Sequence, residues 1–148
     1  MGSFPTFEQF LNNVKEVAPA LFTPEDTIFA YTRAQAIEDG LLVDVSETAR
    51  EAGIRFPVAL TRAAFEDAVT WTRTDVHQDE RGRLWDVLWM LSLAMRRAPA
   101  GRDRVLFTFL RIPNEGRGHV ARKVTFKAVC GPGDTAAPCI TVSLPTED

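Results

Sequence analysis

The chain has 148 residues, of which 45% are hydrophobic and 25% charged, with 9 Gly, 9 Pro and 2 Cys. This composition is typical of one soluble globular domain, and it excludes a disordered tail, a collagen-like or repeat protein, a disulfide-stapled mini-domain and a two-domain enzyme. The net charge of -3 is unevenly spread, because residues 1–80 sum to -8, residues 81–127 to +8 and residues 128–148 to -3. Such a split indicates either a dipolar surface that meets a charged partner, or acidic and basic elements that pair within the fold.

The N-terminal 27 residues predict a helical extension. Thr6 can cap a helix that ends before Pro19, and a second helix start or a tight turn follows at 23–26. An apolar stripe on the first helix could join two copies of the chain, although core packing explains it equally well. The stripe comprises Phe4, Phe7, Phe10 and Leu11.

A short helix and a short strand are expected next. Thr32 and Gln35 have the spacing of a capping box, and Gly40 can adopt the left-handed conformation that ends a helix. The run GLLVDV at 40–45 has the composition of a strand.

Two further helices are expected before the middle of the chain. Ser46 is expected to cap a helix that closes at Gly53, and Thr61 to open one that runs to Trp71. The polar segment 72–82 then predicts a loop.

Residues 83–97 form the most apolar helical segment, interrupted only by Asp86 and Ser92. A helix that is apolar on every side is expected to be buried at the centre of the domain. A carboxylate buried on it needs a partner, so Asp86 predicts an ion pair that joins helix to sheet, or else a functional carboxylate in a pocket.

The last third of the chain predicts three strands, at 104–112, 120–129 and 139–144, joined by turn-rich links as an antiparallel meander. The middle strand alternates apolar and polar residues, so one sheet face meets the core and the other meets water. The first strand has apolar residues at both even-numbered and odd-numbered positions. It is therefore expected inside the sheet, with residues 40–45 beside it. The predicted fold is a single α+β domain with helices packed on one face of a three- to four-stranded antiparallel sheet.

The two cysteines flank a turn but are not expected to form a disulfide. Cys130 shares the parity of the apolar residues of its strand, whereas Cys139 lies on the opposite parity of the next strand. A reduced, cytoplasmic protein fits this pattern best. No secretory signal is recognisable, and no apolar run reaches the length that spans a bilayer, so no membrane association is expected.

Basic side chains on the predicted sheet are the first candidate binding site. They comprise Arg104, Arg111, Arg122, Lys123 and Lys127, with Arg117 in the adjoining turn. The set could be a solvated face, could dock an acidic protein surface, or could bind nucleic acid. Sheets that read nucleic acids usually add exposed aromatic rings, whereas Phe107, Phe109 and Phe126 are expected in the core.

A polar cluster is the second candidate. His77, Asp79 and Asp86, with His119 from a later hairpin, could bind a divalent metal or supply acid–base chemistry. The alternative is that Asp79 caps the following helix and His77 is a surface or packing histidine. No nucleophile elbow, phosphate loop, dinucleotide fingerprint or zinc spacing is present, so no cofactor and no catalytic residue are expected.

Four sequence strings occur in this order: GLLVDVS, RLWDVLWM, GPGD and LPTED. Together they resemble an uncharacterised family of small proteins encoded on bacterial plasmids, phages and integrative elements. The resemblance covers about residues 28–148 and leaves residues 1–27 as an extension. It implies no known activity and no catalytic residues. It implies the setting of a mobile-element accessory protein, and proteins of that setting often block host defence.

Three functions are therefore expected, in decreasing order of preference. The first is a non-enzymatic protein that binds a protein or ribonucleoprotein complex of a bacterial host, most sharply as an anti-CRISPR-like inhibitor. The second is direct nucleic-acid binding by the basic sheet face. The third is a small metal-dependent or acid–base enzyme around His77, Asp79 and Asp86. The partner and the oligomeric state are not determined by the sequence.

Overall fold

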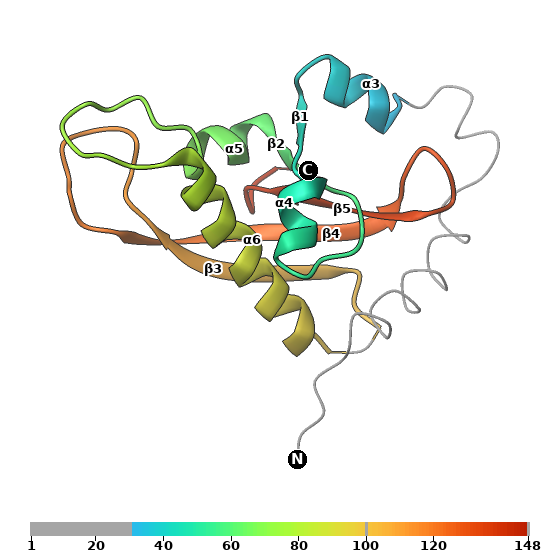
Figure 1. Ribbon diagram of the computed structural model, residues 1–148. Coiled ribbons are helices and arrows are strands. Elements are labelled where there is room, and N and C mark those ends of the chain that lie inside the picture. The colour runs from blue at the N-terminus through green and yellow to red at the C-terminus, as the bar shows by residue number, and fades with distance from the viewer. Residues whose placement is uncertain (1–30, 100, 148) are drawn as a thin grey trace.

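The computed structural model describes residues 31–99 and 101–147 (Figure 1). The helix expected from Thr6 and the helix or turn at 23–26 lie outside these residues. The described elements, in chain order, are α3 (Arg33–Glu38), β1 (Leu42–Asp44), α4 (Ser46–Glu51), β2 (Val58–Thr61), α5 (Arg62–Ala68), α6 (Glu80–Arg97), β3 (Arg104–Arg111), β4 (Arg122–Pro132) and β5 (Pro138–Ser143).

The strands form one five-stranded sheet in the order β1-β2-β5-β4-β3. Neighbouring strands are antiparallel except β2 and β5, which are parallel. The α+β class, the single domain and the C-terminal meander are therefore confirmed. The sheet is mixed, however, not purely antiparallel, because the unpredicted strand β2 joins β1 to the last strand of the meander.

The helix signals are confirmed where they rest on local hydrogen bonds. The Thr32 hydroxyl accepts the Gln35 backbone N–H at 3.0 Å, and the Gln35 side chain accepts the Thr32 N–H at 3.0 Å. Thr61 likewise caps α5, which ends at Ala68 and not at Trp71.

The residue Ser46 is the first residue of α4 and not its cap. Its hydroxyl donates to the Asp44 carboxylate at 2.6 Å and accepts the Val58 N–H at 3.0 Å, and so ties β1 to β2.

The main core lies between the sheet and α4, α5 and α6, as the ribbon shows (Figure 1). Three phenylalanines fill its centre, with Phe126 fully buried and edge-on to Phe109 at a centroid distance of 4.8 Å and to Phe107 at 6.2 Å. The expectation that these rings belong to the core is confirmed. Four side chains of α6 pack against them and their neighbours: Val87, Leu88, Leu91 and Met95.

Helix α6 is amphipathic, so the prediction of a helix buried on every side is wrong. Asp86 is exposed and Trp89 is 40% exposed. The helix packs against β3, which is a sheet edge, so only one of its faces meets apolar side chains and the other meets water.

The opposite face of the sheet is covered in part by α3 and the C-terminal residues. The Arg33 side chain donates to the Thr141 hydroxyl at 2.7 Å and to the Ile140 carbonyl at 2.6 Å. The carboxylate of Asp134, in the turn between β4 and β5, accepts the backbone N–H groups of Arg33 and Ala34 at 2.5 and 3.0 Å. The GPGD turn therefore fastens α3 to the sheet.

The strand β3 lies at the edge of the sheet, so its predicted interior position is wrong, and β1 lies at the other edge. The side chains of one parity, Val105, Phe107 and Phe109, enter the core, whereas Leu106 and Leu110 are 62% and 59% exposed. Apolar residues at both even-numbered and odd-numbered positions of β3 therefore do not mean that other parts of the domain cover both of its faces.

The cysteine prediction is confirmed, since both thiols are free and buried. Cys130 faces Ile140 in the register, and Cys139 faces Gly131, so the two side chains point to opposite faces of the sheet. Burial raises the pKa of both thiols, that of Cys130 to about 12.

Candidate functional site

The face of β3 and β4 that points away from α6 is not covered by any described residue over part of its length. We call it the open face, and it comprises Arg104, Leu106, Thr108, Leu110, Lys123 and Thr125. Its two leucines are its most exposed apolar side chains, and exposed cations lie at Arg104 and Lys123. An apolar patch with a charged rim is typical of a protein–protein interface.

Two of the six predicted basic residues are engaged within the fold. Arg111 points to the helix side and donates to both oxygens of Asp67, at 3.1 and 2.9 Å, with its side chain only 15% exposed. Lys127 is buried and donates to the main-chain carbonyl of Glu147. Neither cation is free to meet a partner in this arrangement.

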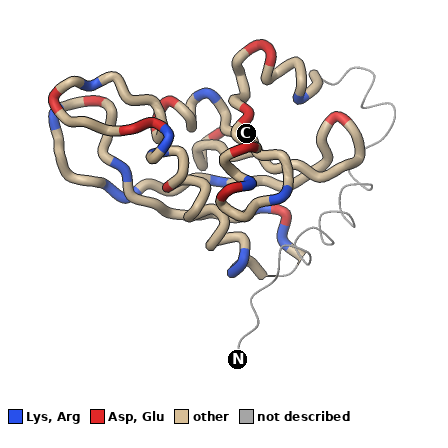
Figure 2. Tube along the Cα trace, viewed as in Figure 1, with Lys and Arg blue, Asp and Glu red and all other residues tan. Residues whose placement is uncertain are grey.

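The other four predicted basic residues, among them Arg104 of the open face, are exposed but do not share one surface. Arg122 faces Arg111 in the register and so lies on the helix side, Arg117 lies in the hairpin between β3 and β4, and Lys123 lies on the open face. Figure 2 shows the basic positions dispersed over this hairpin and the end of α6. The predicted basic patch is therefore divided, and Arg104 and Lys123 are its members on the open face.

The outer edge of β3 carries main-chain groups without a strand partner. The Cys130 N–H donates to the Asp103 carbonyl at 2.8 Å, and this bond sets the phase of the ladder with β4. Because bonded and non-bonded pairs alternate along antiparallel strands, the odd-numbered residues of β3 bond to β4. The even-numbered residues then turn their N–H and C=O groups outward: Arg104, Leu106, Thr108 and Leu110.

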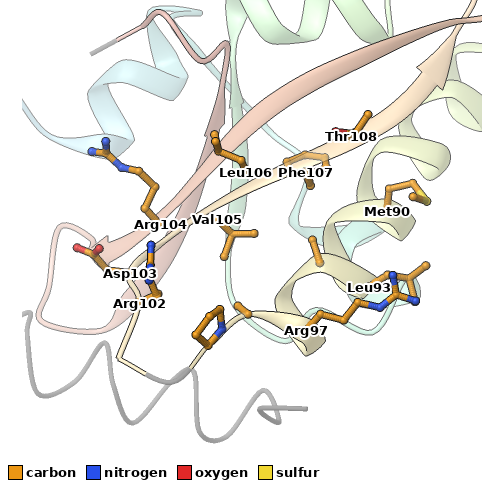
Figure 3. Close-up of a pocket in the computed structure, with 13 residues that line it drawn as sticks. Met90, Leu93, Arg97, Arg102, Asp103, Arg104, Val105, Leu106, Phe107 and Thr108 are labelled. Atoms are coloured by element: carbon orange, nitrogen blue, oxygen red, sulfur yellow. The ribbon is translucent and has the colours of Figure 1, made fainter. Parts of the chain in front are cut away.

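A groove runs beside this edge in two parts. The first, of about 780 Å³, lies between β3 and the C-terminal half of α6, with Met90, Leu93 and Arg97 on its helix side (Figure 3). The second, of about 490 Å³, continues past Met90 to Trp89 and Asp86. We call the two together the edge groove, and its presence means that described side chains leave the outer edge of β3 accessible.

The buried residue Arg83 closes one end of this edge, and sequence reasoning missed it. Its guanidinium donates to the Ile112 carbonyl at 2.8 Å and to the Val69 carbonyl at 3.1 Å, and it lies 4.8 Å from the centre of the Trp71 ring. Burial lowers its pKa. Its position one helical turn before Val87, on the apolar stripe of α6, is the sequence signal that could have indicated a buried arginine.

The predicted polar cluster is not assembled. Asp79 accepts the Arg81 N–H at 3.1 Å and caps α6, which confirms the alternative reading of this residue. His77 and His119 are exposed, in separate loops. Within residues 31–99 and 101–147, no group of three or more His, Cys, Asp or Glu side chains could hold a metal ion.

The ion pair expected for Asp86 is also absent from the described part of the chain. The carboxylate is exposed to water at the rim of the edge groove and does not reach a cation of the sheet. Partial burial raises its pKa, and the positive charge of Arg83 opposes that shift.

The fold and its uncovered edge define a small α+β domain with a candidate protein-binding surface on β3. The chain belongs to the family of unknown function DUF6573, which matches residues 19–148. The expected resemblance to an uncharacterised family is confirmed, and it begins at residue 19 and not at residue 28. Neither a curated protein nor a solved structure matches this chain. Among the described helices, none is both long and apolar enough to cross a lipid bilayer.

Proposed function

We propose that this chain is a non-enzymatic accessory protein of a mobile element that binds a protein complex of its bacterial host in the cytoplasm. The most specific version of this function is inhibition of a host defence complex, such as a CRISPR–Cas effector. The observation that carries the binding function is the open face, where Leu106 and Leu110 stand exposed between Arg104 and Lys123.

The apolar part of the open face supplies the driving force for association. Each exposed leucine gains about 1 to 2 kcal/mol when a partner removes it from water. Two such side chains on one face of a rigid sheet, without any described residue above them, favour a partner that places apolar side chains on the same area.

The charges of the open face favour an acidic partner. Arg104 and Lys123 are exposed, and no ion pair engages either within the described residues. An acidic protein surface would neutralise both, and such rim charges act mainly on the association rate and on the choice of partner.

Nucleic-acid binding is the competing function. The aromatic rings of β3 and β4 face the core, so the open face offers aliphatic side chains and cations but no described ring for base stacking. Binding to a phosphate backbone would therefore depend almost wholly on charge, and its affinity would fall steeply with salt.

The test is capture of the host partner by the purified chain, with and without nuclease, followed by affinity measurement with the purified partner. The double variant Arg104→Glu with Lys123→Glu should lose at least tenfold in affinity and keep its melting temperature. The control is Arg55→Glu, a single charge reversal at an exposed arginine between α4 and β2. A double variant that binds as well as the control would contradict the proposal.

The same experiment separates the alternatives. Recovery of nucleic acid alone, lost on nuclease treatment and weakened steeply by salt, would replace the protein-binding function with the nucleic-acid function. A metal-dependent turnover abolished by His77→Ala would replace both with the enzyme.

A further inference from the structure

The outer edge of β3 is unusual for a sheet edge of its length. The strand has eight residues, and from Val105 to Leu110 it contains neither a charge nor a proline. Natural edge strands are usually short, interrupted by a bulge or protected by charged residues, because a free edge pairs readily with another strand. Here the outward main-chain groups from Arg104 to Leu110 lie beside an open groove.

The sequence of this edge is palindromic. Residues 106–110 read Leu-Phe-Thr-Phe-Leu, with Thr108 at the centre. A two-fold axis that passes beside Thr108, perpendicular to the sheet, would pair the strand with itself in antiparallel register and leave each side chain on its own face.

We propose that the chain forms a homodimer in which β3 pairs with β3 of a second copy, so that the two sheets become one ten-stranded sheet. Thr108 faces Thr108 of the second copy, and Leu106 faces its Leu110. All three residues belong to the row whose N–H and C=O groups point outward, so each facing pair exchanges two main-chain hydrogen bonds.

The side chains support this register on both faces. On the open face, Leu106 meets Leu110 of the second copy, and cross-strand apolar pairs of this kind stabilise a sheet. On the helix side, Phe107 comes beside Phe109 of the second copy, next to rings that are already stacked within each core.

The buried arginine limits the register. A slide of two residues in one direction would need the Ile112 carbonyl for pairing, and Arg83 already occupies it at 2.8 Å. A slide in the other direction brings Arg104 opposite Leu110 and loses the match between the leucines. The axis at Thr108 keeps the leucines matched, and it meets the Ile112 carbonyl only at the terminal pair, Arg104 with Ile112, outside the three central pairs.

The ends of the edge groove are complementary in charge on the helix side. Arg97 lies at one end and Asp86 at the other, both exposed and neither in a described ion pair. The two-fold axis turns the Arg97 end of each copy toward the Asp86 end of the other. On the open face, Lys123 lies on β4, one strand further from the axis, so it does not directly face Arg104 of the second copy.

The first test is directed disulfide formation. Facing residues of a hydrogen-bonded pair have Cα atoms about 5.5 Å apart, within reach of a disulfide, so Thr108→Cys should give a covalent dimer on mild oxidation. Leu106→Cys is the matched control, since its two copies would lie four residues out of register, roughly 13 Å apart. The native Cys130 and Cys139 are buried and should not compete.

The second test is the mass in solution, by sedimentation equilibrium. The full chain should have twice the mass of one copy, and Leu106→Lys should be a monomer, because a lysine protects the edge. Val120→Lys makes the same change at a hairpin residue that is 75% exposed, and it should remain a dimer.

Three results would overturn the proposal. The first is a monomer up to about 100 µM, where an interface of micromolar affinity would be almost fully occupied. The second is a dimer that survives Leu106→Lys, which would place the contact elsewhere, for example in residues 1–30. The third is a covalent dimer from Leu106→Cys but not from Thr108→Cys. The outcome is independent of the host partner, since Lys123→Glu should weaken partner binding and leave the dimer intact.

Discussion

Replacement of the buried arginine tests the packing between α6, β3 and the end of α5. Arg83→Met keeps the length of the side chain and removes its charge and donors. The Val69 and Ile112 carbonyls would each lose a charged donor, at about 1.5 kcal/mol each, and the contact with the Trp71 ring adds about 1 kcal/mol.

One gain offsets part of this loss. Within the described residues, the Arg83 Nη2 atom is buried without a hydrogen-bond partner, and the variant removes it at a gain of about 1 kcal/mol. The expected net decrease in the free energy of unfolding is therefore about 3 kcal/mol, a large share of the 5 to 15 kcal/mol typical of a domain.

The assay is urea unfolding followed by circular dichroism and tryptophan fluorescence. The midpoint should fall while the slope stays constant, because the surface exposed on unfolding does not change. Arg81→Met is the matched control: that side chain is 79% exposed, lies 3.8 Å from Glu51, and should change stability by less than about 0.5 kcal/mol. A loss for Arg83→Met as small as that of the control would refute the reasoning.

Three further outcomes are expected. Asp134→Ala should lower the free energy of unfolding by about 1 to 2 kcal/mol in the same assay, because two N–H groups at the start of α3 lose their acceptor, and equal stability would show that water replaces it. Phe126→Ala should cost about 3 to 5 kcal/mol, since it empties the centre of the ring cluster, and a smaller loss in urea would indicate that the core collapses into the space. Cys130 and Cys139 should stay unlabelled by a thiol reagent at pH 8 in the folded chain and react fully in urea, because burial raises their pKa and keeps them protonated, and rapid labelling without urea would contradict their burial.

The sequence predicts those parts of the fold that depend on near neighbours in the chain. The capping box at Thr32, the cap at Thr61 and the opposite faces of the two cysteines all follow from residue type and spacing within a few positions. They are confirmed because the hydrogen bonds and the strand alternation that they reflect are local.

The position of a strand in the sheet is not local, and here prediction failed. Strand β2 has four residues, too few for a period to show, and it pairs with β5 from the far end of the chain. The exposed leucines of β3 look like core residues in the sequence, because composition does not distinguish a face covered by the same chain from one left uncovered.

The candidate site could be predicted only in part for the same reason. The alternation of residues along β4 correctly predicts that Lys123 lies on the open face. Arg111, however, is engaged by Asp67, which is 44 residues away, and Lys127 by Glu147, which is 20 residues away. The partners of Arg83 are also distant, and one of them is the Ile112 carbonyl, which has no sequence signature.

The central place of β5 has a consequence for how the protein reaches its native state during synthesis. Strand β5 joins β2 on one side to β4 on the other, so a chain without residues 138–143 holds two separate strand pairs, β1 with β2 and β3 with β4. Each pair is only marginally stable alone. The sheet therefore cannot close until β5 has left the ribosome, and until then both strand pairs expose apolar side chains that a chaperone would have to shield.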